Sequence, residues 1–89
     1  MRAVITVLGC DRVGIIAGIT AVLAETNTNI LDISQTIVSD IFTMIMIVDL
    51  TGSKIDFGQL HERLTQVGKE LGMEIRLQRE EIFRSMHRI

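Results

Sequence analysis

The chain has 89 residues, 47% of them apolar, and nine Lys and Arg against eleven Asp and Glu leave a formal charge of −2. This length allows one domain. A single cysteine argues against disulfides and cysteine-rich zinc sites, the lack of a basic stripe argues against nucleic-acid binding, and the lack of a long apolar run argues against a membrane span. Because so short a chain has little interior for this much apolar surface, we expect an oligomer. The first residues do not have the pattern of a signal peptide, and we expect a cytoplasmic protein.

The first part of the chain predicts a strand, a turn and a helix. β-Branched residues over 2–8 predict the strand, and the sequence GCDR at 9–12 predicts the turn. Asp11 is expected to be the helix N-cap, because its carboxylate can accept from N–H groups two or three residues further along. Apolar residues at spacings of three and four predict a helix over 13–25. Gly14 and Gly18 share one stripe of it, and we expect them to let the backbone approach the sheet or a ligand.

The next segment predicts two strands joined by a tight reversal at residues 39–40. The strand over 30–39 has one apolar face with Leu31, Ile33 and Ile37. The strand over 41–50 is apolar on both faces, which is typical of a strand covered on both sides. We expect helices to cover one face and another subunit to cover the other.

The last part of the chain predicts a helix, a strand and a tail. Asp56 is expected to cap the helix, with Gln59 as its capping-box partner and Gly72 as the residue that ends it. The strand follows over 73–79. The tail over 80–89 carries apolar residues at helical spacing, which we expect to pack on the uncovered sheet face or across a dimer: Ile82, Phe83, Met86 and Ile89.

The order βαββαβ predicts an α+β fold, a ferredoxin-like sandwich with a four-stranded antiparallel sheet, two helices on one face and a short C-terminal helical tail. Other functions of this fold need residues that the chain lacks. An acylphosphatase-like enzyme needs a glycine-rich phosphate cradle, an RNA-recognition module needs aromatic residues on its central strands, and a metal carrier needs a CxxC loop. We therefore expect no catalytic residue, no metal site and no cofactor.

Two segments carry a family resemblance. Residues 9–17, GCDRVGIIA, resemble the first strand-to-helix turn of ACT domains, which are small-molecule-sensing modules of amino-acid metabolism. Residues 29–35, NILDISQ, look like the second strand of that family. The resemblance predicts an ACT domain over 1–79, followed by the tail at 80–89. The tail looks like the ending of a small stand-alone ACT family of bacteria and archaea.

The resemblance implies a non-enzymatic regulatory module that forms a homodimer or higher oligomer and binds an amino acid or similar molecule at the subunit interface. By motif position, Asp11 matches the loop residue that contacts the ligand's amino group, and Asn29 matches an asparagine that contacts its carboxylate or amine. Gly14 matches the glycine that lets the backbone approach. The other candidate ligand-binding residues flank these three: Arg12, Val13, Ile15, Ile30 and Leu31.

Structural interpretations of the same residues stay open. Asp11 can serve as a cap alone, Asn29 can close the turn before the strand, and Arg12 can be a solvated charge. Cys10 is expected to be a small buried residue rather than a reactive thiol. The alternative function is a ligand-independent dimeric regulator that acts on a protein target, resembling the glycine-cleavage repressor accessory protein and using its tail as the contact surface.

Overall fold

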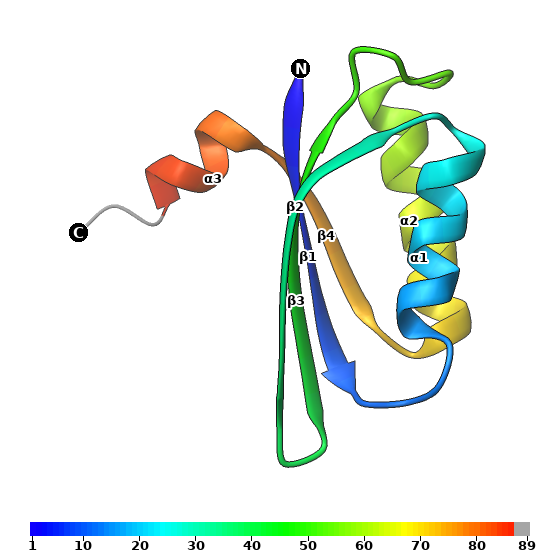
Figure 1. Cartoon of the computed structure of the whole chain (residues 1–89), viewed down its shortest axis with the longest axis vertical. Helices are drawn as coiled ribbons and strands as arrows, with labels where there is room; N and C mark the ends of the chain where they lie inside the picture. The colour runs from blue at the N-terminus through cyan, green and yellow to red at the C-terminus, as the bar shows by residue number, and fades with distance from the viewer. Residues whose placement is uncertain (87–89) are drawn as a thin grey trace.

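A computed structural model describes residues 1–86. The four strands form one antiparallel sheet in the order β2-β3-β1-β4, and Figure 1 shows α1 and α2 against one face, with α3 on the other side. The elements in chain order are β1 (Arg2–Cys10), α1 (Ile15–Glu25), β2 (Asn29–Val38), β3 (Ile41–Asp49), α2 (Phe57–Leu71), β4 (Glu74–Arg79) and α3 (Glu80–Met86). The expected ferredoxin-like fold with a short C-terminal helix is confirmed. Ile89, the last member of the expected tail stripe, lies outside the described residues.

The core lies between the sheet and the two long helices. Alternate residues of the two central strands point toward the helices, as the period of two in a strand requires. Burying each of the larger apolar side chains contributes about 1.5–3 kcal/mol relative to leaving it in water. The buried apolar residues of this layer are Ala3, Ile5 and Val7 of β1, Phe42, Met44, Met46 and Val48 of β3, Leu77 of β4, Met73 just before β4, and Ile15, Ile19, Val22, Leu23, Leu60 and Leu64 of the helices.

Helix α2 begins and ends as the sequence predicts. The Asp56 carboxylate accepts from the backbone N–H of Gln59 at 2.8 Å, and the Gln59 side chain accepts from the N–H of Asp56 at 3.1 Å. These two bonds form the expected capping box. Gly72 follows the helix with φ 69°, in the left-handed region that favours glycine.

Two glycines allow the chain to pass closely at the turn between α2 and β4. A Cβ atom on Gly68 would lie 2.8 Å from the Met73 carbonyl oxygen. A Cβ atom on Gly9, in β1, would lie 2.7 Å from the Met73 sulfur. Gly18 of α1 packs against α2, where its Cβ would lie 3.2 Å from a methyl group of Leu71, so the close approach it allows is to a helix and not to the sheet.

The sheet face opposite α1 and α2, called the open face below, is covered only near the chain termini. Helix α3 contacts β1 and β4 there, and Arg2 forms an ion pair with Glu80 at 2.9 Å. Val4, on this face, is only 2% exposed, whereas Leu8 further along β1 is 44% exposed. Within the described chain, β1 is therefore covered on its second face only at this end, and Ile45 of the neighbouring β3 is 39% exposed on that face.

The open face is built of rows of paired side chains, which the strand register defines. From the α3 end to the hairpin between β2 and β3, the rows over β1, β3 and β2 are Val4, Ile47 and Asp32, then Thr6, Ile45 and Ser34, then Leu8, Thr43 and Thr36, and last Cys10, Ile41 and Val38.

Strand β2 forms an open edge of the sheet. Residues 31–40 are all exposed, including Leu31, Ile33 and Ile37, which the sequence predicts as an apolar face. These three side chains are not buried within the chain, because β2 lies outermost in the sheet and pairs only with β3. A β-bulge at Leu31 interrupts the pairing with β3. A ten-residue edge with so few charges is a template for pairing with another strand.

Candidate functional site

The loop between β1 and α1 is fixed by two long-range hydrogen bonds. The Asp11 backbone N–H donates to the Asp40 carbonyl of the β2–β3 hairpin at 2.7 Å. The Arg12 guanidinium donates to the Leu71 carbonyl at the end of α2 at 3.1 Å. The loop is thus tied to two other elements, and Arg12 is bonded within the chain rather than only solvated.

Helix α1 begins later than expected, and Asp11 is not its cap. The helix starts at Ile15 and not at Val13, and its N-cap is Gly14, with φ 94° and no side-chain hydrogen bond to the helix end. Asp11 thus lies three residues before the N-cap position, and its backbone N–H is bonded to the hairpin instead. A positive φ favours glycine, so conformation explains Gly14, and nothing lies within 4 Å of a Cβ built on it.

The first turn of α1 therefore offers free backbone donors. The first intrahelical bond runs from the Gly18 N–H to the Gly14 carbonyl at 2.9 Å, which leaves the N–H groups of residues 15–17 without a partner in the helix. Ile16 and Ala17 are exposed there. Such a helix end attracts an anion, for example a carboxylate. The Asp11 carboxylate, nearby in the loop, is exposed and accepts no hydrogen bond from the described residues.

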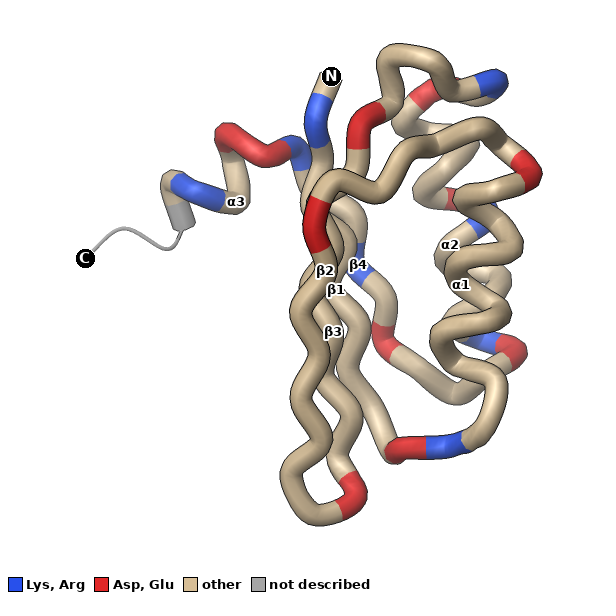
Figure 2. Tube along the Cα trace, in the orientation of Figure 1, with Lys and Arg blue, Asp and Glu red and all other residues tan. Residues whose placement is uncertain are grey.

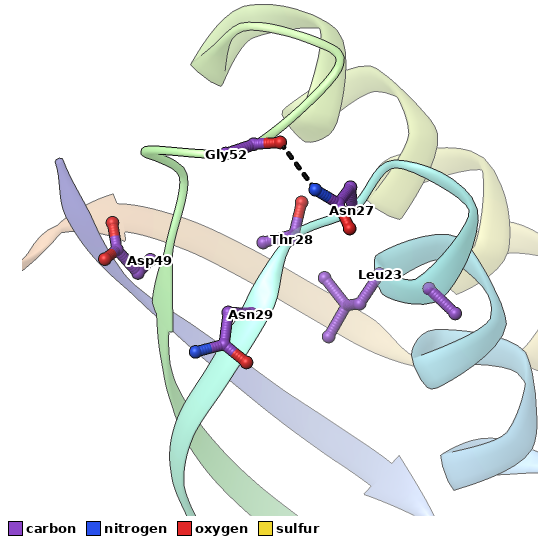
Figure 3. A pocket seen from close by; sticks show the side chains of 7 residues that line it. Leu23, Asn27, Thr28, Asn29, Asp49 and Gly52 are labelled. Carbon is purple, nitrogen blue, oxygen red and sulfur yellow. Dashed lines mark hydrogen bonds between the residues drawn. The ribbon is translucent and has the colours of Figure 1, made fainter.

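Asn29 lies at the other end of the molecule, in an open polar pocket of about 310 Å³. Figure 3 shows its side chain near those of Thr28 and Asp49, from the start of β2 and the end of β3. The Asn27 amide donates to the Gly52 carbonyl at 2.8 Å and so ties the α1–β2 turn to the β3–α2 loop. Leu23 and Ala24 of α1 also line the pocket.

Asp49 is a member of this pocket that sequence reasoning missed. Its carboxylate accepts from the Thr51 hydroxyl at 2.7 Å and from the Thr51 backbone N–H at 3.0 Å, which hold the pKa of Asp49 below its usual range. The sequence signal was an aspartate two residues before a threonine, a pattern typical of a turn. Its proximity to Asn29 follows only from the strand register, in which the two residues are paired.

The candidate residues fall into two groups at opposite ends of one chain. Residues 11–15 lie by the β2–β3 hairpin, whereas residues 29–31 lie near the chain termini (Figure 1). The ten residues of β2 separate them by about 30 Å. Among them, the side chain of Ile15 is buried and that of Ile30 packs on the core, so only their backbones are available to a ligand. Val13 is 96% exposed.

Residues 1–86 contain neither a metal-binding cluster nor a membrane-spanning helix. No cluster of three or more His, Cys, Asp or Glu side chains in this range has metal-binding geometry. No helix in it is long and apolar enough to cross a membrane. Cys10 is a free thiol and is exposed, so the expectation that it is buried is wrong, because it lies at the end of β1 on the open face.

Comparison with known proteins gives consistent results. A family model described as an ACT domain matches residues 2–78. A UPF0237 protein of Methanocaldococcus jannaschii is 54% identical over 88 residues, which is 99% of this chain and 98% of that protein. An ACT domain protein from Streptococcus pneumoniae has a similar structure, with a TM-score of 0.80, 41% identity and 93% of each chain covered.

A regulatory protein is among the similar structures. The regulatory subunit of aspartate kinase from Thermus thermophilus matches with a TM-score of 0.67 and 28% identity. The match covers 86% of this chain and 50% of that one.

Proposed function

Because this chain belongs to the ACT domain family, we propose that it is a non-enzymatic, homo-oligomeric regulatory module that binds an amino acid or similar small molecule between two subunits. The observation that carries the proposal is the exposed β2 edge, with residues 11–15 beside one of its ends and residues 29–31 at the other. One chain holds both halves of the candidate site but does not bring them together.

Pairing of two β2 edges unites the two halves. Two strands related by a two-fold axis at this edge run antiparallel, so the start of each lies beside the end of the other. The end of β2 continues into the hairpin, whose Asp40 carbonyl accepts from the N–H of Asp11. Asn29 of the partner subunit then lies beside the loop that begins at Asp11.

The chemistry of the united site suits a zwitterion. The free N–H groups of residues 15–17 bind a carboxylate, and the Asp11 carboxylate balances an ammonium group. Asn29 of the partner subunit can donate to the carboxylate or accept from the ammonium. The exposed Val13 and Leu31 supply apolar contacts for a side chain, and Arg12 holds the loop through Leu71.

Similarity to a regulatory subunit of aspartate kinase supports the regulatory part of the proposal. A cytoplasmic location is part of it too, since the single cysteine is a free thiol.

A thermal unfolding screen with the twenty L-amino acids tests ligand binding. A ligand at about 100 times its Kd adds about 2.7 kcal/mol of stability, and each kcal/mol raises the Tm of a domain this size by about 4–8 °C. We expect one or a few amino acids to raise the Tm. The shift should be lost in Asp11→Ala and Asn29→Ala and kept in Glu62→Ala and Gln66→Ala, which remove exposed polar groups from α2.

A mixing experiment tests whether the site is shared between subunits. Refolding Asp11→Ala together with Asn29→Ala gives mixed dimers in which one site has both residues, so about a quarter of the wild-type sites should return by calorimetry. A site contained in one chain would restore no binding in the mixture.

If no amino acid raises the Tm at concentrations up to millimolar, the result would contradict the sensor and favour the ligand-independent regulator.

A further inference from the structure

A groove runs between α1 and α2 on the surface that faces away from the sheet. Its volume is about 560 Å³, and no strand residue lines it. The apolar residues of its lining are small or aliphatic: Gly18, Ala21 and Val22 of α1, Val67 of α2, and Ile55 from the loop before α2. Small residues let another helix approach closely, because the side chains at a contact set the distance between packed helices.

The charged part of the lining is acidic. Glu25 ends α1, and Glu62 and Glu70 lie on α2. Arg63 is the one cation of the lining, and it forms an ion pair with Glu25 across the two helices. Three carboxylates and one guanidinium leave a charge of −2 at the groove, which equals the formal charge of the whole chain.

Two of these carboxylates have little within the chain to neutralise them. Among residues 1–86, the Glu62 side chain forms no hydrogen bond or ion pair, and Glu70 accepts one long hydrogen bond, from the Gln66 amide at 3.4 Å. Both glutamates are exposed. Eight residues separate them, which is about 12 Å along α2. The groove therefore has two free negative charges spaced along its length.

The two walls of the groove differ in character. Helix α1 carries no charged residue before Glu25, its last residue, as Figure 2 shows. Helix α2 places a polar side chain on the groove in each turn, at Gln59, Glu62, Gln66 and Glu70. One wall is apolar and the other is acidic, so the groove matches a partner that is apolar on one side and basic on the other.

We propose that this groove binds a basic amphipathic helix of a target protein. The apolar side of that helix packs on Ala21 and Val67, and its lysine or arginine side chains face Glu62 and Glu70. The groove spans residues 59–70 of α2, so about three turns of the bound helix are in contact. An amphipathic helix in an apolar groove is a recurrent mode of recognition. This surface lies apart from the β2 edge, and the proposal does not rest on the proposed ligand.

Charge selects this occupant over others. Two copies placed groove to groove would bring like charges together, and the short helix α3 of a second copy begins with two glutamates, Glu80 and Glu81. The phosphates of nucleic acids and of anionic lipids are repelled by the same carboxylates. A basic helix instead gains attraction at Glu62 and Glu70 and covers the apolar wall.

Binding of a synthetic helix tests the proposal. The peptide has about 15 residues, enough to form a helix, with alanine and leucine on one side and lysine on the other. Its control has glutamate in place of lysine. NMR of the isotope-labelled protein should show amide shifts confined to residues 18–25 and 59–70 with the lysine peptide, and none with the glutamate peptide. Shifts centred on the β2 edge or on the open face, or no shifts at all, would overturn the proposal.

Paired charge variants test whether the glutamates of the groove are responsible. Glu62→Gln with Glu70→Gln should weaken peptide binding about 2- to 25-fold by calorimetry, since each exposed ion pair is worth about 1.4- to 5-fold. Glu74→Gln with Glu81→Gln removes the same charge from β4 and α3. This control should keep the affinity within about twofold, because solvent and salt screen distant charges. An equal loss in both pairs would assign binding to net charge and overturn the proposal.

A change of shape at constant charge tests the apolar wall. Ala21→Phe fills the groove and should abolish the shifts, whereas Ala24→Phe, exposed on the same helix but outside the groove, should keep them. Circular dichroism checks that both variants fold. Spermidine carries positive charge without an apolar helix face, so it should compete weakly with the peptide. Unchanged shifts in Ala21→Phe, or displacement of the peptide by an equal concentration of spermidine, would overturn the proposal.

Discussion

At the scale of single residues, Asp49 links ionisation to stability. Its carboxylate is held in the charged form by the Thr51 hydroxyl first and the Thr51 N–H second, so its folded-state pKa lies below the unfolded value. Such a group contributes stability that is present above its unfolded pKa and is lost as the pH falls through the folded pKa. The effect belongs to the acid limb of the stability profile.

Thr51→Val tests this assignment. The substitution removes the hydroxyl donor but keeps the backbone N–H, so the pKa of Asp49 should rise toward its usual range without reaching it, and the acid limb should become shallower. Titration of the Asp49 carboxyl carbon by NMR measures the change. Thr51→Ser keeps the donor and should leave the pKa of Asp49 low. An equal pKa in the valine and wild-type proteins would show that the hydroxyl has no such role.

Two glycines of α2 should respond to the same substitution with opposite signs. In Gly68→Ala, the new methyl group meets the Met73 carbonyl oxygen at 2.8 Å, and moving the backbone should lower the free energy of unfolding by about 1–3 kcal/mol. In Gly58→Ala, the nearest atom is 3.5 Å away, so the lower entropy of the unfolded chain should stabilise by about 0.5 kcal/mol. Urea unfolding measures both, and a stabilised Gly68→Ala would mean that the turn relaxes freely.

At the scale of elements, the two long helices differ in how their first turns are stabilised. α2 has a complete capping box, whereas α1 has no side-chain cap. Asp56→Ala should therefore cost about 1 kcal/mol of unfolding free energy in urea. Asp56→Asn keeps an acceptor oxygen and should retain most of the stability. An equal loss in both variants would assign the effect to the charge at the helix N-terminus and not to the hydrogen bonds.

The same contrast explains which elements the sequence predicts. The signals of α2 are local, since Asp56, Gln59 and Gly72 act within a few residues, and its bounds were predicted correctly. The start of α1 was predicted two residues too early, because the chain from Asp11, whose backbone N–H bonds to the distant β2–β3 hairpin, to the N-cap Gly14 stays outside the helix. The exposure of Ile33 and Ile37 depends on where β2 stands in the sheet, which no local pattern contains.

At the scale of the whole molecule, the order of elements predicts the fold, but the candidate site depends on non-local geometry. The chain order and short connections lead to the sandwich, as predicted. The separation of Asp11 from Asn29 and the pairing of Asn29 with Asp49 follow only from the strand register. The sequence also contains no signal for how two copies meet. The role of the eight candidate residues therefore stays a prediction, which the mixing experiment tests.

The central position of β1 has a consequence for biosynthesis. The first strand to be made pairs on one side with β3 and on the other with β4, the last strand of the sheet. About 70 residues separate β1 from the end of β4, and at about 5–20 residues per second their translation takes roughly 4–14 seconds. During that time β1, uncharged from Ala3 to Cys10, waits without its second neighbour. The sheet can therefore be completed only after β4 has been made, and until then β1 is exposed to pairing with other unfinished chains.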